Sequence, residues 1–307
     1  MRKRILITGG TGTIGRAFIK NYYDGNVLFY NISRNENSQV QLHKDFPRIP
    51  LQLLGSIEDK NFIFRAFEKI KPDIVIHTAA VKHIDLAEKQ PFHTCKVNLI
   101  GSMNIIEASI RTNVPTTIAI STDKACSSAS VYGDTKSLME KCFLESNSNK
   151  NRFSVCRFAN VAHSNGSVLP FWLKLKSEGK PLKLTDPNMN RLMFTQTDAA
   201  RLINRTIKYT EGNGGGFVSS YKMKCVNMLD LAKVISEDID ITGKRPGEKT
   251  NEDLIAQHEL PYTYVRGNDI HIRSEVNEGK NRLDVPYNSE SAQKMSSYEM
   301  RELVEWN

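Results

Sequence analysis

The residues of this chain that are best suited to move a proton are Tyr132 and Lys136, which lie four positions apart. On a helix, this spacing places two side chains on one face, where both can reach the same bound molecule. A phenol has a reference pKa of about 10 and is a poor base at neutral pH, but a nearby ammonium favours its deprotonated form. We therefore predict that Lys136 lowers the pKa of Tyr132 and that Tyr132 acts as an acid–base catalyst. The alternative is a chance pair on an ordinary helix.

A second group of polar residues, Thr122, Asp123 and Lys124, precedes this pair. These residues follow an apolar, β-branched run at 116–120, which predicts a buried strand. Because open α/β sheets bind their ligands beyond the carboxyl ends of the strands, we expect the three side chains to face a ligand. The alternative is a structural ion pair between Asp123 and Lys124 at the end of the strand.

A glycine motif lies near the N-terminus, between a short apolar run at 4–7 and a helical pattern. Glycine permits the tight turn, a close approach of the backbone to a pyrophosphate, and close packing of helix on strand. The first turn of the helix also offers free N–H groups and the positive end of its dipole to the phosphates. The sequence therefore predicts dinucleotide binding. The residues expected to contact the dinucleotide here are Gly9, Thr11, Gly12, Thr13, Ile14 and Gly15.

The end of the second predicted strand, at 27–32, indicates which dinucleotide is bound. An NAD-specific site usually has an acidic residue there, which binds the ribose hydroxyls. This chain has Ser33 and Arg34 instead, and a guanidinium can pair with the 2′-phosphate of NADP. We therefore predict NADP as the cofactor. The alternative is that Arg34 is a solvated loop residue.

Repeated strand and helix patterns extend this arrangement. Further strands are predicted at 50–54 and 73–77, and helices at 58–70 and 92–112. Such repeats predict an α/β fold, a Rossmann-type doubly wound parallel sheet with helices on both faces and a smaller C-terminal lobe. Residues at the ends of these strands, and one on the following helix, are expected to contact the cofactor: Ser56, Ile57, Ala79, Ala80, Lys82 and Asn98.

The sequence changes character after a sixth predicted strand at 153–158, where turn-rich segments become frequent. We predict an NADP-binding domain with the catalytic residues at 1–155. Residues 156–307 are predicted to form mainly a nucleotide-sugar-binding lobe, with late strands that return to the sheet. The glycine-rich segment at 212–216 predicts a flexible turn, and the mixed segment at 255–283 gives no clear prediction.

Composition and charge restrict the class of protein and of partner. The net charge is +8, but it is diffuse apart from the run at 2–4, which suits an anionic small molecule at least as well as nucleic acid. The apolar run that follows stops at Thr8, too early for a signal peptide or a membrane helix. The five cysteines lack a C-x-x-C spacing, so we expect reduced thiols in a cytoplasmic protein and no metal site. No nucleic-acid or membrane partner is expected.

Taken together, these residues resemble those of the extended short-chain dehydrogenases/reductases. The glycine motif and the Tyr132–Lys136 pair carry this broader resemblance. More narrowly, the chain resembles, over nearly its whole length, the soluble UDP-N-acetylglucosamine 4,6-dehydratases that invert the sugar at C5. The motifs that carry the narrower resemblance are AAVKHI at 79–84, STDKA at 121–125, RFANV at 157–161, GSVLPF at 166–171 and RPGEK at 245–249.

The resemblance implies a reaction in which bound NADP accepts a hydride from C4 of the sugar and returns it to C6. Tyr132 would remove the proton of the C4 hydroxyl, Thr122 would hydrogen-bond the same oxygen, and Lys136 would touch the nicotinamide ribose. Asp123 is implied as the acid that protonates the leaving C6 hydroxyl, and Lys124 as the base and proton donor at C5. A lysine base must be unprotonated at neutral pH, which requires desolvation or a cationic neighbour.

The resemblance also implies substrate contacts in the C-terminal lobe. Arg191 and Arg245 would bind the diphosphate of a UDP-sugar, for which planar guanidinium groups are suited, and Glu248 would bind the ribose. Two positions depart from the pattern of the relatives: Ser56 stands where they have Asp, and the loop at 126–130 lacks their Pro and Asn. The other residues expected at the substrate are Lys82, His83, Asn160, Ser167 and Val168.

Two other functions share this fold. A nucleotide-sugar C4 epimerase or reductase would need no acid–base pair at C5 and C6, so Asp123 and Lys124 argue against it. A non-catalytic NADP-sensing protein would need no phenolate, so the presence of Thr122, Tyr132 and Lys136 argues against it.

The identity of the sugar and the configuration at C5 stay open, and the oligomeric state is inferred by analogy. The sequence does not decide between N-acetylglucosamine and glucose, nor does it decide the configuration at C5. Apolar faces on the helices predicted at 92–112 and 135–146 suit the four-helix seam that is common among dimers of this superfamily. A homo-oligomer, a dimer or a higher assembly, is therefore expected.

Overall fold

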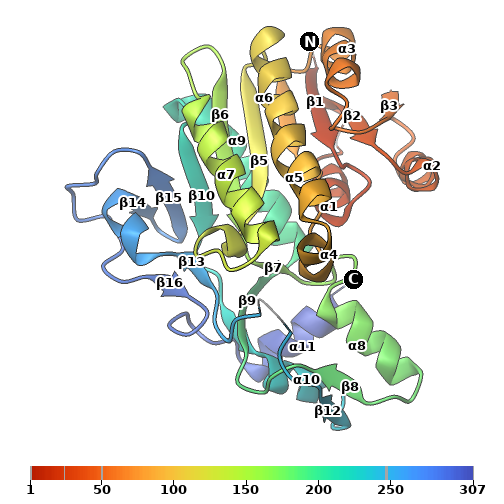
Figure 1. The fold of residues 1–307 in the computed structure, drawn as a ribbon, viewed down its shortest axis with the longest axis vertical. Coiled ribbons are helices and arrows are strands. Elements are labelled where there is room, and N and C mark those ends of the chain that lie inside the picture. The colour runs from red at the N-terminus through yellow and green to blue at the C-terminus, as the bar shows by residue number, and fades with distance from the viewer. Residues whose placement is uncertain (1, 24, 50, 246–247, 307) are drawn as a thin grey trace.

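The computed structural model describes residues 2–23, 25–49, 51–245 and 248–306. Its main part is a sheet with helices on both faces, and a smaller lobe lies beyond one end of the strands (Figure 1). The predicted Rossmann-type α/β fold is confirmed. None of the helices in the described ranges is long and apolar enough to cross a membrane.

The central sheet contains nine strands within the described ranges, in the order β14-β15-β10-β6-β5-β4-β1-β2-β3. Strands β1 to β6 and β10 pair in parallel, whereas β15 pairs antiparallel with both β10 and β14. The chain order reverses at β1, which lies between β2 and β4, and ligands of such sheets bind at this point. The strands are β1 (Lys3–Thr8), β2 (Val27–Ser33), β3 (Leu51–Leu54), β4 (Ile74–His77), β5 (Thr116–Thr122), β6 (Arg152–Phe158), β10 (Phe217–Tyr221), β14 (Thr263–Arg266) and β15 (Asp269–Arg273).

Helices bury both faces of this sheet. In β1, Ile5 and Ile7 belong to the core under α1 and α9, whereas Leu6 belongs to the opposite core under α3 and α6. Burial on both faces explains why the strands are apolar runs rather than alternating patterns. The helices around the sheet are α1 (Thr13–Tyr22), α2 (Glu36–Asp45), α3 (Lys60–Ile70), α4 (Ile84–Lys89), α5 (Pro91–Cys95), α6 (Gly101–Arg111), α7 (Val131–Glu145) and α9 (Gln196–Asn213).

The helix predicted at 92–112 is observed as three connected segments. Helix α5 continues through a π-helical turn (Lys96–Ile100) into α6. Such turns insert an extra residue into a helix and frequently occur at functional sites. Asn98 lies in this turn and is buried.

The smaller lobe has its own apolar core, which includes Leu169, Trp172 and Leu231. It joins short sheets to three helices and lies below the central sheet in Figure 1. Its strands pair as β11-β9-β7, as β12-β8 and as β13-β16. Its elements are β7 (Asn160–Val161), α8 (Val168–Ser177), β8 (Leu182–Leu184), β9 (Asn190–Phe194), β11 (Cys225–Asn227), α10 (Met228–Ile235), β12 (Ile239–Ile241), β13 (Asp253–Ile255), β16 (Tyr287–Asn288) and α11 (Ser297–Glu305).

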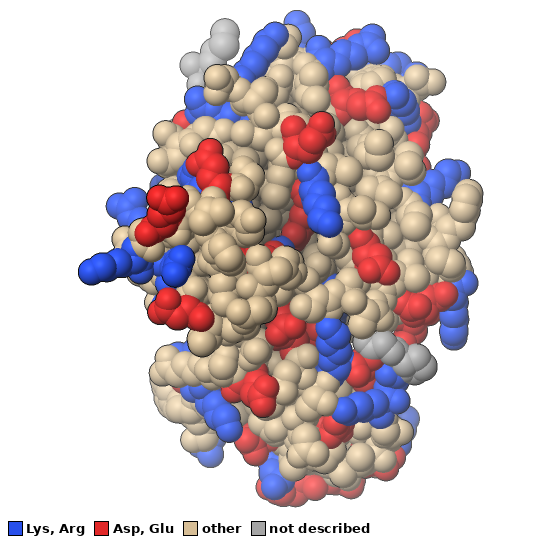
Figure 2. All heavy atoms as spheres, turned by 60° about the vertical axis from the view of Figure 1, so that its left-hand side comes forward, with Lys and Arg blue, Asp and Glu red and all other residues tan. Residues whose placement is uncertain are grey.

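The segments at 212–216 and 255–283 differ from what the sequence predicted or left open. The turn predicted at 212–216 is wrong for its first two residues, which complete α9 before Gly214 ends the helix with a φ of 92°. The segment at 255–283, which gave no clear prediction, contains the β14–β15 hairpin at the edge of the central sheet. On the face shown in Figure 2, which brings this side forward, Lys and Arg side chains alternate with Asp and Glu.

Candidate active site

A cavity of about 630 Å³ opens at the carboxyl ends of the parallel strands. Its lining includes the glycine loop after β1, the segment Ala79–Lys82 after β4, and Thr122, Tyr132 and Lys136. A second cavity of about 580 Å³ lies on the side of the smaller lobe. The residues that line both cavities are Lys82, His83, Ile84, Lys124, Asn160, Val161 and Ser164. The site therefore has one compartment against the sheet and one against the lobe.

The glycine loop is shaped for a close approach to a ligand. Gly9 has a φ of +76°, and a Cβ there would lie 2.9 Å from Thr78 Oγ1. A Cβ on Gly15 would lie 2.5 Å from the Cα of Gly10, so this glycine lets α1 pack against the loop. Gly12 is the N-cap of α1 and supplies no side-chain cap, which leaves N–H groups of the first turn for an anion. This geometry fits a pyrophosphate.

The residues expected at the adenosine end lie along the same cavity, with one exception. Ser33 and Arg34 at the end of β2, together with Ile57, line it. Ser56 does not line it, and its hydroxyl donates a hydrogen bond of 2.9 Å to Glu58 Oε2. The exposed Arg34 guanidinium is available to a 2′-phosphate at this rim, so the residues present fit NADP.

Asn98 lies behind the cavity wall rather than in it. Its Oδ1 accepts a hydrogen bond of 2.7 Å from the backbone N–H of Val81, and its Nδ2 donates one of 2.9 Å to the Val81 carbonyl oxygen. Nδ2 also lies 3.1 Å from Thr135 Oγ1 on α7. The Asn98 amide is thus bound to protein groups and does not line the cavity. It contacts Val81, which lines the cavity, in place of the expected contact with the cofactor.

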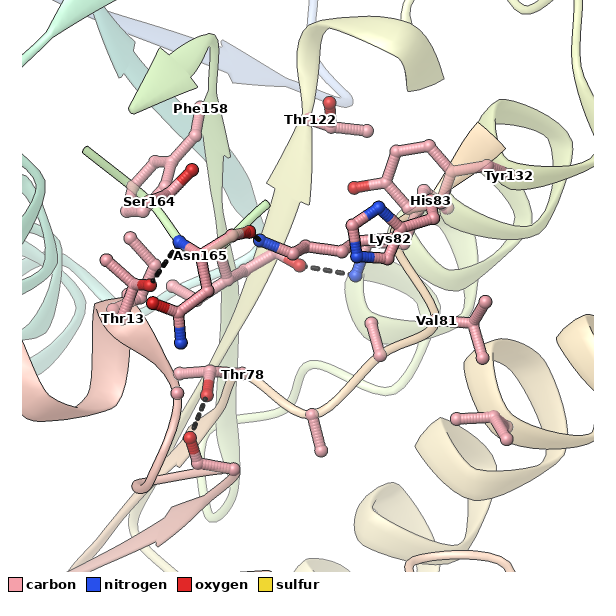
Figure 3. Close-up of a pocket in the computed structure, with 18 of the residues that line it drawn as sticks. Thr13, Thr78, Val81, Lys82, His83, Thr122, Tyr132, Phe158, Ser164 and Asn165 are labelled. Carbon is pink, nitrogen blue, oxygen red and sulfur yellow. Dashed lines mark hydrogen bonds between the residues drawn. The ribbon is translucent and has the colours of Figure 1, made fainter. Parts of the chain in front are cut away.

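The residues expected to be catalytic meet where β5 ends and α7 begins. Thr122 Oγ1 donates to Asp123 Oδ1 at 2.9 Å, and Lys124 Nζ donates to the same oxygen at 3.0 Å. Thr122 lowers the pKa of Tyr132, against the rise that burial causes. Figure 3 shows the Tyr132 ring reaching from α7 towards the middle of the cavity. The other carboxylate oxygen of Asp123, Oδ2, is buried and has no hydrogen-bond partner among the described residues.

Helix α7 is fixed by a buried ion-pair network. Arg157 on β6 lies 2.6 Å from Glu140 on α7 and 2.8 Å from Glu259, which follows β13. The Cys126 thiol, in the loop that departs from the relatives' pattern, donates to Glu259 at 3.2 Å, and burial raises the pKa of this thiol. The network therefore joins the helix that carries Tyr132 to β6 and to the segment after β13.

The structure corrects the expected role of Lys136. Its Nζ donates to the Ile120 carbonyl oxygen at 2.5 Å and lies 3.3 Å from Met139 Sδ. Burial lowers the pKa of Lys136 to about 8. Burial raises the pKa of Tyr132, and the cation that opposes this rise is Lys124. The prediction that Lys136 lowers the pKa of Tyr132 is wrong for this structure, because its ammonium is bonded to the end of β5.

Lys124 differs from its expected protonation state in a similar way. Burial lowers the pKa of this lysine and so does Arg191, as the proposed base would require. Asp123 and Glu252 outweigh both effects, and the pKa of Lys124 is raised. In this structure the surroundings of Lys124 therefore favour its ammonium form, and burial and Arg191 alone do not meet the condition stated for a lysine base.

The residues expected at the diphosphate and ribose line the second cavity but are engaged with the protein. Arg191 is buried and donates to the carbonyl oxygens of Asn190, Lys249 and Thr250 at 2.8–3.0 Å. Arg245 lies 2.8 Å from Glu248 and 3.5 Å from Asp85 on α4. The rest of the predicted motif, residues 246–247, lies outside the described residues. A diphosphate at Arg245 would compete with these carboxylates.

The other expected substrate residues surround the boundary between the cavities. Asn160 donates to the Leu192 carbonyl oxygen at 3.2 Å, and the His83 ring packs against Gly166, where a Cβ would lie 2.7 Å from the ring. Ser167, the N-cap of α8, has a buried hydroxyl with no partner among the described residues, and Val168 begins the helix. Ser167 and Val168 both line the second cavity.

Two features of the site were missed by the sequence analysis. Asn165 lines the cavity against the sheet, where its N–H donates to Thr13 Oγ1 and its carbonyl oxygen accepts from Lys82 Nζ at 2.5 Å (Figure 3). Burial lowers the pKa of Lys82. Glu252 is buried beside Lys124. Neither Asn165 nor Glu252 belongs to a local pattern that marks a site, since each contact joins residues distant in sequence.

The fold, the glycine loop and the Thr122–Tyr132–Lys136 group define a short-chain dehydrogenase/reductase of the extended type. The chain belongs to the family described as polysaccharide biosynthesis protein, whose profile matches residues 5–273.

Known relatives carry two kinds of name. A Campylobacter jejuni protein named UDP-N-acetylglucosamine 4,6-dehydratase (inverting) is 35% identical over 86% of this chain and 80% of its own length. A Rickettsia canadensis protein named UDP-glucose 4-epimerase is 26% identical over 98% of this chain and 95% of its own. The X-ray structure of Pen from Bacillus thuringiensis superposes with a TM-score of 0.91 at 30% identity, over 99% of this chain and 97% of that one.

Proposed function

We propose that this protein is an NADP-dependent UDP-N-acetylglucosamine 4,6-dehydratase that inverts the sugar at C5. The observation that carries the proposal is the Asp123–Lys124 pair beside Tyr132, with Asp123 Oδ2 unpartnered among the described residues. Dehydration needs an acid at C6 and a base at C5 in addition to the group that acts at C4. The relative named for this reaction supports the proposal.

The chain's own residues divide the work as follows. The glycine loop and Arg34 would hold NADP, which would supply the acceptor for a hydride from C4 of the sugar and its donor to C6. Tyr132 takes the proton of the C4 hydroxyl while Thr122 hydrogen-bonds the same oxygen. The resulting ketone acidifies the C5 proton, which Lys124 removes as Asp123 protonates the leaving hydroxyl. The product is a UDP-2-acetamido-2,6-dideoxy-hexos-4-ulose, a precursor of deoxy amino sugars.

Lys124 must lose a proton before it can act as the base. Asp123, 3.0 Å away, is the nearest carboxylate to this amine, and a transfer to it would also make Asp123 the carboxylic acid that the C6 hydroxyl requires. One proton transfer within the pair therefore produces both catalysts. Asp123 lines neither cavity and its Oδ2 is buried, so the proposal requires this side chain to turn towards the substrate when the sugar binds.

The binding roles divide between the two cavities. We assign NADP to the cavity against the sheet, which belongs mainly to the domain at 1–155. We assign the nucleotide sugar to the cavity against the lobe, which is built mainly from 156–307. Arg191 has further N–H groups beyond those bonded to backbone oxygens and can bind the diphosphate with Arg245. Lys82 lies at the boundary, within reach of both ligands.

We also propose a homo-oligomer in the cytoplasm. Large apolar side chains are exposed along the α5–α6 segment and α7, and Phe92 is 81% exposed. Because apolar patches of this kind mark protein interfaces, two copies of the chain can pair these helices. The other side chains in this surface are Ile100, Met103, Ile110 and Leu138.

A nucleotide-sugar C4 epimerase is the second candidate, favoured by the epimerase name of the Rickettsia relative. The two functions are separated by mass spectrometry of UDP-N-acetylglucosamine, UDP-glucose and their products after incubation with the protein and NADP. The dehydratase predicts the loss of one water from UDP-N-acetylglucosamine. An epimerised sugar of unchanged mass would contradict it, and loss of water from UDP-glucose alone would change the substrate.

A further inference from the structure

Glu252 places a second buried carboxylate beside Lys124. Its Oε1 lies 3.9 Å from Lys124 Nζ, while Asp123 Oδ1 lies 3.0 Å from the same nitrogen. Glu252 is 5% exposed and lines the cavity against the lobe, whereas Lys124 lines both cavities. The ammonium therefore lies between a carboxylate on the strand end and a carboxylate from the second half of the chain.

The position of Glu252 is fixed by its backbone. Its N–H donates to Ser289 Oγ at 2.9 Å, and its carbonyl oxygen accepts from the N–H of Ser289 at 3.0 Å. Ser289 is 1% exposed, and the adjoining strands β13 and β16 pair with each other. This contact holds the carboxylate in the site independently of any ligand.

A buried carboxylate is costly unless a cation compensates it. Burial raises the pKa of Glu252, and Lys124 is the strongest influence that opposes this rise. Glu252 precedes β13 and lies at the wall of the cavity. A carboxylate exposed to solvent at this wall could be replaced by any polar residue, but Glu252 is buried. The arrangement indicates that the Glu252 carboxylate acts electrostatically on the Lys124 amine.

We propose that Glu252 is a positioning residue for Lys124: its carboxylate orients the Lys124 amine and stabilises the ammonium that forms when this amine takes the C5 proton. This inference rests on the proposed function. In the step concerned, the C5–H bond breaks and its proton forms an N–H bond on Lys124. The electron pair forms the C5–C6 double bond, and the C6–O bond breaks as Asp123 donates its proton to the departing water.

The role is comparable to that of the buried carboxylate behind the histidine of a serine protease, which orients a base and stabilises its protonated form. Such a residue affects the base more than it affects substrate binding. The charged or titratable groups that act on Lys124 are Asp123 from its own turn, Tyr132 from α7, Arg191 from β9, and Glu252. The substitution Glu252→Gln changes only the last of these.

The test is the pH profile of dehydration by Glu252→Gln, with Asp253→Asn as the matched control. The control makes the same carboxylate-to-amide change one residue away, on half-buried Asp253 of β13. Loss of the Glu252 charge lowers the pKa of Lys124, so the alkaline limb of kcat, along which the Lys124–Asp123 pair loses its one proton, moves down by about one pH unit. A weaker, less well oriented base lowers the plateau kcat about tenfold, with KM nearly unchanged. The control is predicted to match the wild type.

A deuterium isotope effect identifies the affected step. In Glu252→Gln, we predict a larger effect with substrate deuterated at C5 and a smaller one with substrate deuterated at C4, because removal of the C5 proton limits the rate. A purely structural role would raise KM or lower the melting temperature without moving the alkaline limb or shifting the isotope effect from C4 to C5. That result would overturn the proposal.

Glu252→Asp keeps the proposal testable if Glu252→Gln folds poorly. The aspartate retains the charge, so it is predicted to keep the alkaline limb near its wild-type position. A limb displaced as far as in Glu252→Gln would overturn the role of the charge. Wild-type protein that dehydrates no UDP-sugar would contradict the proposed function itself, whereas wild-type turnover with an unmoved limb in Glu252→Gln contradicts only the inference about Glu252.

Discussion

Asn98 binds both backbone polar groups of Val81: its Oδ1 accepts from the N–H at 2.7 Å and its Nδ2 donates to the carbonyl oxygen at 2.9 Å. Val81 lies in the segment after β4 that lines the cavity against the sheet. The π-helical turn therefore supports the cofactor wall from behind. Asn98 contributes to the site without being exposed in it.

We predict that Asn98→Ala destabilises the protein by about 2–4 kcal/mol, because two buried backbone groups lose their partner. Urea unfolding followed by circular dichroism measures this loss. Affinity for NADP is expected to fall as well, because the wall around Val81 loosens. Asn37→Ala, the same truncation at an exposed position of α2, is the control and is expected to change stability little. An Asn98→Ala protein as stable as the wild type would contradict the role of Asn98.

His77 predicts a loss of stability at acid pH. Its ring lies 2.7 Å from Thr8 Oγ1 and 2.9 Å from Ser102 Oγ, and burial lowers its pKa to about 3. Because the unfolded histidine has a pKa near 6.5, the unfolded chain binds the proton first as the pH falls. Stability contributed by the neutral ring is present above pH 6.5 and is lost towards pH 3.

The expected loss from this one group between pH 7 and pH 5 is about 2 kcal/mol. Urea unfolding of the wild type and of His77→Gln at both pH values measures it, since the variant lacks the titrating ring. The free energy of unfolding of His77→Gln should fall by about 2 kcal/mol less than that of the wild type. Equal falls would show that His77 titrates normally in the folded protein.

Arg34 determines the preference for NADP in this account. Arg34→Ala is predicted to weaken NADP binding about tenfold or more, because a charge-assisted contact with the 2′-phosphate is lost. Binding of NAD, which lacks this phosphate, is expected to change little. Calorimetric titration with both dinucleotides measures the difference, and Lys44→Ala on exposed α2 provides the control. Equal affinity of the wild type for both dinucleotides would contradict the assignment.

Lys124→Ala is predicted to reduce dehydration at least a hundredfold, because the base at C5 is removed. NADP binding, measured by the same titration, is expected to be retained, since the glycine loop and Arg34 are unchanged. Loss of NADP binding would instead show that Lys124 has a structural role in an ion pair with Asp123.

Local sequence patterns were sufficient for the sheet and the glycine loop. The apolar runs at β1 and β5 reflect burial on both faces of a strand, and this information is contained in a few consecutive residues. The glycines at 9 and 15 have steric reasons that are equally local, because each faces backbone or side-chain atoms of neighbouring turns.

The charge states in the site could not be predicted in this way. Lys136 was expected to act on Tyr132, but its direction depends on the Ile120 carbonyl oxygen at the end of β5. The pKa of Lys124 depends on Glu252, which is more than 100 positions away in the sequence and reaches the site through the pairing of β13 with β16. Such contacts exist only once the two halves of the chain have folded together.

The most direct test of the central claim is proton NMR of UDP-N-acetylglucosamine incubated with the protein and NADP in deuterated water. We predict a 4-keto-6-deoxy product with deuterium at C5 and ring couplings of the inverted configuration, and no such product with Lys124→Ala. Dehydration with the original C5 configuration would contradict inversion. Unchanged UDP-N-acetylglucosamine in the presence of protein that binds NADP would contradict the claim that this chain is a dehydratase of that sugar.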